Sequence, residues 1–153
     1  MEGIPLIRTD FFSSDSIYEI KRPDIESGST YFFQTKSGLT YEVTFGKKKN
    51  NYLGNIINFS VISDEYEDEY SETNRGEVYT IIRTMVEIIR IYHEKHPYSN
   101  SYEFSGEHKD NRDDDPVSIR TKLYYREALR AIDQKNWTLS LEGNKVTITR
   151  NPL

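Results

Sequence analysis

Apolar and polar positions alternate in the first half of the chain in a way that predicts a β-meander. From 39 to 45 every second side chain is apolar, directly after the turn sequence Lys36-Ser37-Gly38. A further apolar run covers 52–62, after a second polar turn at Lys47–Asn51. A period of two is the pattern of a strand with one buried face and one solvated face. Together with the aromatic run Tyr31–Phe33, it predicts three antiparallel strands in succession.

Apolar residues at three- and four-residue intervals predict two amphipathic helices in the second half. The first runs from about Gly76 to Lys95 and ends before Pro97. The second starts at Pro116, capped by Asp115, and continues to about Asp133. A short aromatic strand, 102–106, separates the helices, and alternating residues on both sides of a turn at 142–144 predict a terminal hairpin.

These elements give the order βββ-α-β-α-ββ over residues 30–150. Residues 1–29 contain scattered Pro, Gly, Ser and Asp between short apolar pieces, so we expect an extended or irregular segment that lies against the domain. We therefore expect one α+β domain over 1–153, with a mixed, mostly antiparallel sheet and two packed helices. In this sheet the strands at 52–62 and 102–106, before and after the first helix, should pair in parallel.

Composition narrows the possible classes of function. The chain has 153 residues and no cysteine, which excludes a disulfide scaffold, a thiol nucleophile and zinc sites built from thiolates. Its formal net charge of -5 disfavours binding to the phosphate backbone of nucleic acids, which depends on Lys and Arg. No apolar stretch is long enough for a membrane span, and the first residues lack the pattern of a secretory signal. We expect a cytoplasmic protein without a membrane or nucleic-acid partner.

The order of elements resembles the GNAT fold of N-acetyltransferases, with the resemblance covering roughly Thr30 to Arg150. In that family the strands before and after the long helix splay apart, and the cleft between them holds acetyl-CoA. The second helix often carries a Leu-Tyr pair whose tyrosine acts as the general acid toward CoA thiolate. Lys122-Leu123-Tyr124-Tyr125-Arg126 resembles that segment, so the resemblance implies that Tyr124 is the catalytic candidate. Arg120, one turn earlier, is a candidate ligand-binding residue of the same cleft.

The segment that would bind the CoA pyrophosphate departs from the family pattern Arg/Gln-x-x-Gly-x-Gly/Ala. The corresponding residues are Thr73-Asn74-Arg75-Gly76-Glu77-Val78, in which Arg75 and Gly76 are the remaining ligand-binding candidates. A carboxylate follows them, and six acids lie between 64 and 72, so a ligand with several phosphate charges would be repelled. We therefore predict no cofactor and no catalytic residue, with an atypical acyltransferase or a protein that sequesters a nucleotide-like molecule as the alternative.

The sequence also resembles small, uncharacterised phage-borne proteins. The similar pieces are a helix of the type Val-x-x-Ile-Ile-x-x-x-Val-x-Ile-Ile, here within Val78–Tyr92, a short strand at Tyr102–Ser105, and an Arg-x-x-Leu-Tyr helix, here Arg120–Tyr124. This resemblance implies an accessory or virion-associated role with no known chemistry. The location would then be the host cytoplasm or the virion.

Three further groups of residues are candidates for sites. His93 and His96 lie three residues apart at the end of the long helix, a spacing that can hold a metal, although the helix dipole alone also favours histidine there. Arg126 and Arg130 share one face of the second helix and could contact an acidic partner. The acidic segment could contact a basic partner through Glu65, Tyr66, Glu69 and Tyr70. For both charged groups the plain alternative is a solvated surface.

The sequence therefore predicts a non-enzymatic protein that acts by protein–protein binding. A structural virion subunit, in which 30–45 or the terminal hairpin pairs with another copy at the sheet edge, is a further alternative. Two structural outcomes separate the alternatives. A ligand-binding protein would direct Arg120 and Tyr124 into an open cleft, whereas a binding module would fill that cleft with aromatic side chains.

Overall fold

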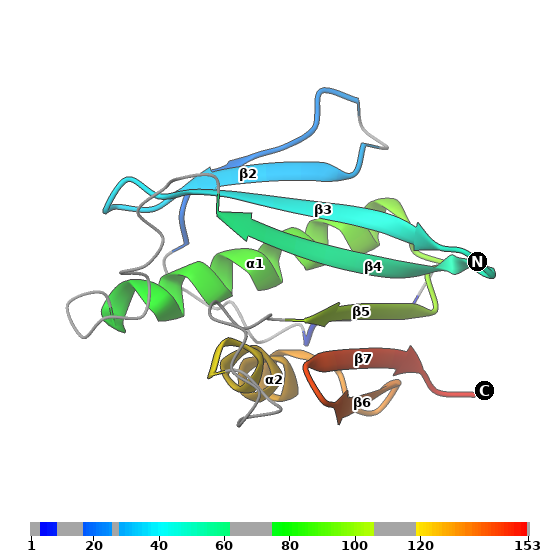
Figure 1. Cartoon of the computed structure of the whole chain (residues 1–153). Helices are drawn as coiled ribbons and strands as arrows, with labels where there is room; N and C mark the ends of the chain where they lie inside the picture. Colours follow the sequence, from blue (N-terminus) through cyan, green and yellow to red (C-terminus); the bar gives the residue numbers. More distant parts are fainter. Residues whose placement is uncertain (1–3, 9–16, 26–27, 62–74, 106–118, 153) are drawn as a thin grey trace.

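Seven strands form one sheet in the order β1-β2-β3-β4-β5-β7-β6 (Figure 1). The structure is a computed structural model that describes residues 4–8, 17–25, 28–61, 75–105 and 119–152. The strands are β1 (Ile20–Lys21), β2 (Thr30–Gln34), β3 (Thr40–Lys48), β4 (Asn51–Val61), β5 (Ser101–Ser105), β6 (Trp137–Glu142) and β7 (Lys145–Arg150). All neighbouring pairs are antiparallel except β4 and β5.

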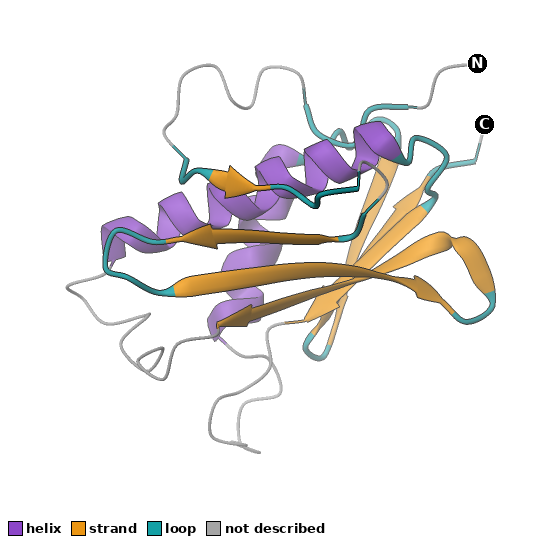
Figure 2. Ribbon diagram, turned by 90° about the horizontal axis from the view of Figure 1, so that it is seen from above, coloured by secondary structure: helices purple, strands orange, loops and turns teal. Residues whose placement is uncertain are grey.

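Two helices, α1 (Arg75–Lys95) and α2 (Ile119–Ala131), cover the same face of the sheet (Figure 2). Phe59 of β4, Phe104 of β5 and Ile148 of β7 point toward both helices and line one space with them. The predicted α+β class, the mostly antiparallel sheet and the two helices are confirmed. So is the parallel pairing of the strands before and after α1, which extends from Gly54↔Ser101 to Ile57↔Phe104. The predicted first turn of the second helix, at Pro116, lies outside the described residues.

Aromatic side chains from the sheet form much of the layer beneath α1. The rings of Phe45 and Tyr92 stack with centroids 3.9 Å apart, and those of Phe33 and Tyr41 stack at 5.0 Å. Helix α1 contributes an aliphatic face that includes Ile88, which is fully buried. Burial of an aromatic or aliphatic side chain of this size stabilises a fold by about 1.5–3 kcal/mol, so this layer fixes α1 on the sheet.

The N-terminal segment adds more to the fold than the sequence indicated. Leu6 is only 1% exposed, and Ile7 forms an antiparallel bridge with Ile132 at the end of α2. The indole nitrogen of Trp137 donates to the carbonyl oxygen of Pro5 at 3.0 Å. The short strand β1 also lies in the segment expected to be irregular, where it pairs with β2 through Ile20↔Phe33 and Lys21↔Phe32. This pairing depends on partners distant in sequence, which local patterns do not reveal.

The opposite face of the sheet carries mainly small and polar side chains where the structure describes it. Thr44, Asn58 and Thr147 lie on this face, together with half-buried Phe32 and Ile56. No helix among the described residues is both long and apolar enough to span a membrane.

Asn55 connects three elements inside the protein. Its side chain is fully buried, and its Oδ1 accepts hydrogen bonds from the Tyr92 hydroxyl at 2.9 Å and from Lys47 Nζ at 3.1 Å. Its Nδ2 donates to the carbonyl oxygen of Ser101 at 3.1 Å. The amide therefore joins β4 to α1, β5 and the end of β3.

We predict that Asn55→Ala lowers the free energy of unfolding by about 1–3 kcal/mol, because buried partners lose their hydrogen bonds. Asn58→Ala, three residues further along β4 and exposed on the other face, is the matched control and should change it by less than about 0.5 kcal/mol. Urea denaturation of both variants measures the difference. Equal stabilities would show that Asn55 does not organise this part of the core.

Candidate functional site

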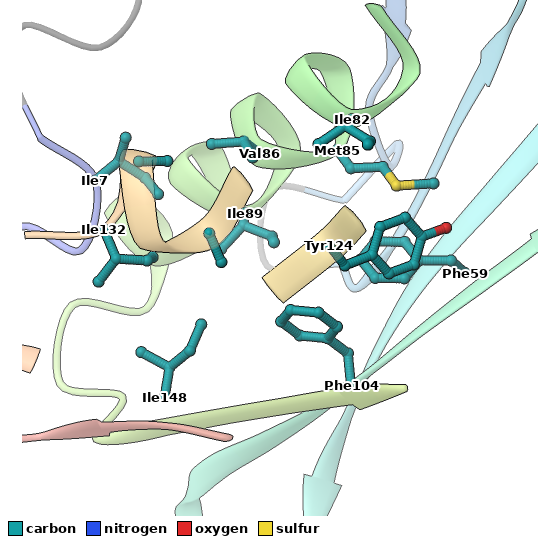
Figure 3. A pocket seen from close by; sticks show the side chains of 12 residues that line it. Ile7, Phe59, Ile82, Met85, Val86, Ile89, Phe104, Tyr124, Ile132 and Ile148 are labelled. Carbon is teal, nitrogen blue, oxygen red and sulfur yellow. The ribbon is translucent and has the colours of Figure 1, made fainter. Parts of the chain in front are cut away.

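The predicted cleft lies where β4 extends past its last residue paired with β5. The pairing stops at Ile57↔Phe104, and β4 continues to Val61. Figure 3 shows the rings of Tyr124, Phe59 and Phe104 gathered beneath Met85 of α1.

Three aromatic rings fill this place. The Tyr124 ring lies 5.3 Å from the Phe59 ring and 6.0 Å from the Phe104 ring, in edge-on contacts. Phe59 and Phe104 also make an edge-on contact with each other, at 5.8 Å. Tyr124 is 5% exposed. Its ring is therefore part of the core rather than the wall of an open cleft.

The remaining cavity is small and apolar. Its volume is about 30 Å³, and a cavity needs about 10–15 Å³ to hold one water molecule, so this space is large enough for only a few water molecules. Its other walls are aliphatic and come from α1, α2, β7 and the N-terminal segment, with Ile7, Ile89 and Ile148 among them. Among the described residues, this space has no room for a nucleotide-like ligand.

The other residues predicted for the cleft cannot be placed beside Tyr124. Arg75 and Gly76 begin α1, and Arg120 lies in the first turn of α2, but the side chains of Arg75 and Arg120 lie outside the described part of the structure. Pyrophosphate binding at the start of α1 therefore stays untested. Of the candidate cleft residues, only Tyr124 is located.

Both histidines of the predicted metal site contact other parts of the fold. His93 Nδ1 lies 2.6 Å from the Tyr102 hydroxyl, and Nε2 lies 2.8 Å from the carbonyl oxygen of Ile4. Because both ring nitrogens have hydrogen-bonding partners, His93 has no nitrogen available for a metal. His96 stacks on Tyr92 at 4.0 Å instead. The described residues contain no group of three or more His, Asp or Glu side chains that could hold a metal ion.

Of the charged residues predicted to contact a partner, the structure describes only the two arginines of α2. Arg126 and Arg130 both approach the buried Glu127, with their nitrogens 3.5 and 3.6 Å from its Oε2. The Arg126 guanidinium also donates to the Tyr79 hydroxyl at 3.2 Å. Both arginine side chains remain more than half exposed, which fits a solvated helix face as well as a contact surface. Glu65, Tyr66, Glu69 and Tyr70 lie outside the described residues.

A surface that the sequence analysis did not identify lies at the other end of the sheet. Three large side chains are exposed there: Tyr52 by 84%, Tyr98 by 52% and Leu53 by 45%. Asn100 holds the two segments together, because its N–H donates to the Leu53 carbonyl at 2.8 Å and its Oδ1 accepts from Asn51 Nδ2 at 3.0 Å. We name this surface the basic aromatic end, and it consists of Lys47, Lys48, Lys49, Tyr52, Leu53 and Tyr98.

The residues that make up this surface carry only positive charge, although Lys47 Nζ is directed toward Asn55 Oδ1 inside the protein. Residues 46–54 contain three lysines and no acid, and 95–101 also contain no acid. Lys48 Nζ lies 3.4 Å from Glu103 Oε2 on β5, so its charge is partly compensated, whereas Lys49 is exposed at the turn. Gly54 allows this arrangement, because a Cβ there would lie 2.6 Å from Lys48 Cδ and 2.9 Å from Ser101 Oγ.

In the sequence this surface corresponds to three consecutive lysines with Tyr-Leu shortly after them. That pattern by itself predicts only a turn and the start of a strand. Tyr52 and Leu53 precede Gly54, the first residue of β4 that pairs with β5. Their exposure therefore depends on where β5 begins. The residues of β4 alone give no information about that position.

His93 gives a testable dependence of stability on pH. Burial lowers the pKa of His93 below its ordinary value of 6.5, and the hydrogen bond to the Ile4 carbonyl offsets only part of this effect. The unfolded chain then binds a proton at higher pH than the folded protein does. The free energy of unfolding should consequently decrease as the pH falls below about 6.5 and toward the lower pKa of the folded state.

In His93→Gln, which cannot titrate at this position, that contribution to the slope should disappear. His96→Gln leaves His93 and its two partners in place and should retain the slope. Urea denaturation between pH 7.5 and pH 5 provides the measurement. An unchanged slope in His93→Gln would assign the pH dependence to other groups.

Comparison with known proteins gives no match: no family model matches the chain, and neither does any curated protein or solved structure. The GNAT-like assignment and the phage-type resemblance therefore stay predictions. What the chain does has to be inferred from its own residues.

Proposed function

We propose that this protein is not an enzyme and that it binds an acidic segment of another protein through the basic aromatic end. The observation that carries this proposal is the exposure of Tyr52, Leu53 and Tyr98 beside lysines at one end of the sheet. Tyrosine is among the residues that contribute most to binding energy in protein interfaces. Lysines at the rim attract and orient a partner of opposite charge.

The surface is held in shape before any partner arrives. Hydrogen bonds join Leu53 to Asn100 and Asn51 to Asn100, and Asn55 joins the adjacent part of β4 to α1. A preorganised surface loses less conformational freedom on binding, so more of the contact energy appears as affinity. This favours a recognition surface over a solvated turn.

The aromatic filling of the predicted cleft supports the same proposal. A ligand-binding protein was expected to have an open cleft, and a binding module was expected to have a cleft filled by aromatic side chains. The packing of Phe59, Phe104 and Tyr124 matches the filled cleft. The short motifs shared with phage-borne proteins support a phage-type accessory or virion-associated setting for this binding.

Lysines beside exposed tyrosines would also suit single-stranded nucleic acid, because its bases stack on aromatic rings and its phosphates pair with lysines. The net charge of -5 and the acids at 64–72 disfavour this partner. A polypeptide that mixes acidic and aromatic residues fits both the lysines and the exposed rings. It carries fewer negative charges per unit length than a phosphate backbone, so the acids of this protein repel it less.

We predict that the protein binds a random glutamate–tyrosine copolymer more tightly than polyglutamate, and that added salt weakens the binding. The double variant Lys49→Glu/Tyr52→Ser should weaken it at least about tenfold, because it reverses one charge and removes the most exposed ring. Lys36→Glu/Ile25→Ser makes equivalent changes at exposed positions outside this surface and should bind like the unmodified protein. Fluorescence anisotropy with labelled copolymer measures all three affinities.

Equal binding by both double variants would contradict the assigned surface. Tighter binding to an oligothymidylate than to the copolymer would replace the protein partner with single-stranded nucleic acid.

We further predict that added acetyl-CoA leaves the native mass spectrum unchanged, because the cavity beside Tyr124 holds about 30 Å³. A one-to-one adduct that is lost in Tyr124→Phe would instead support the acyltransferase or sequestering alternative. Coenzyme A and ATP serve as controls for nonspecific phosphate binding.

A further inference from the structure

The acidic part of the sequence is attached to the end of the fold opposite the basic aromatic end. Residues 62–74 connect the end of β4 to the start of α1, and 106–118 connect the end of β5 to α2. Because β4 and β5 run parallel, both connections leave the sheet at the same edge. The connection 62–74 contains six acids, Tyr66 and Tyr70, and no Lys or Arg.

The two ends are far apart within one molecule. Helix α1 has 21 residues, which corresponds to about 31 Å of helix. From Val61 back to Tyr52, β4 covers about 30 Å at the usual rise of a strand. Figure 1 shows the start of α1 and the turn between β3 and β4 at opposite ends of the molecule.

The acidic connection is too short to bridge this distance in its own molecule. Both of its ends are fixed at the far edge, by Val61 and Arg75. At the maximal extension of a polypeptide, its midpoint reaches no more than about 25 Å from them. The copy of the acidic segment that could reach the basic aromatic end therefore belongs to another molecule.

We propose that the basic aromatic end binds residues 64–72 of a second copy of this chain, so that the protein associates head to tail. This inference rests on the proposed function and names the acidic partner. Charge complementarity carries it: lysines with exposed Tyr52 and Tyr98 on one side meet acids with Tyr66 and Tyr70 on the other. Since the two surfaces differ, each molecule keeps one surface of each kind, and association continues into a ring or a filament.

Sedimentation velocity of the full chain, over a range of protein and salt concentrations, tests the inference. We expect species larger than a dimer at low salt and monomers at high salt, because the Debye length falls from about 30 Å at 0.01 M to about 3 Å at 1 M salt. Lys49→Glu/Tyr52→Ser disables the basic side, and Glu65→Lys/Glu69→Lys disables the acidic side. Each variant alone should be monomeric.

An equimolar mixture of the two variants is the decisive measurement. One variant keeps the intact acidic segment and the other keeps the intact basic aromatic end, so one contact can form and no second one can follow. The mixture should give a dimer and nothing larger, which also demonstrates that both variants are folded. Lys36→Glu/Ile25→Ser should assemble like the unmodified protein.

Other results would overturn the inference. Assembly that persists in Glu65→Lys/Glu69→Lys, or a mixture that stays monomeric, would remove the acidic segment as the occupant. A dimer of the unmodified protein that never grows would indicate a two-fold symmetric contact instead. If the unmodified protein is monomeric but binds the glutamate–tyrosine copolymer, this inference fails while the proposed function stands; if it does neither, both fail.

Discussion

The parallel pairing of β4 with β5 is the constraint on which the rest of the structure depends. Two parallel neighbours require a crossover that returns the chain to the starting edge, and α1 is that crossover. The helix must therefore begin where β4 ends and finish near where β4 begins. This places the connection that contains Tyr98 beside Tyr52 and Leu53. It also places Val61 and Arg75, the two described residues that flank the acidic part of the sequence, at the opposite end of the sheet.

Much of the fold was predictable because its elements have strong local patterns. The spacing of Ile81, Ile82, Met85 and Ile89 defines the buried face of α1, and the alternation from Leu39 to Phe45 defines the inward side of the meander. The parallel pairing was predicted from element order and is confirmed. Strand β1 was missed, because two residues carry no period and its position depends on pairing with Phe32 and Phe33.

The candidate site was less predictable, since it depends on the volume left between packed side chains and on which side chains are exposed to solvent. A sequence can place Tyr124 on a helix that faces the sheet, but whether its ring lines a cleft or fills it depends on Phe59 and Phe104 at the same depth. His93 is similar: its spacing from His96 suggests a metal, whereas its actual partner is the carbonyl oxygen of Ile4, 89 residues away. The exposure of Tyr52 likewise depends on β5, whose first residue pairs with Gly54, two positions after Tyr52.

The two-residue strand β1 has a consequence for how copies of this protein can meet. It covers β2 at Phe32 and Phe33, and Arg22-Pro23 follows it directly. Proline offers no backbone N–H, and a strand of two residues gives an incoming chain few main-chain groups to pair with, so this side of the sheet resists the strand-by-strand stacking that leads to amyloid. The head-to-tail association that we propose would, by contrast, be reversed by salt, because it depends on charged surfaces. Arrays formed in this way would separate into single molecules when the salt concentration rises.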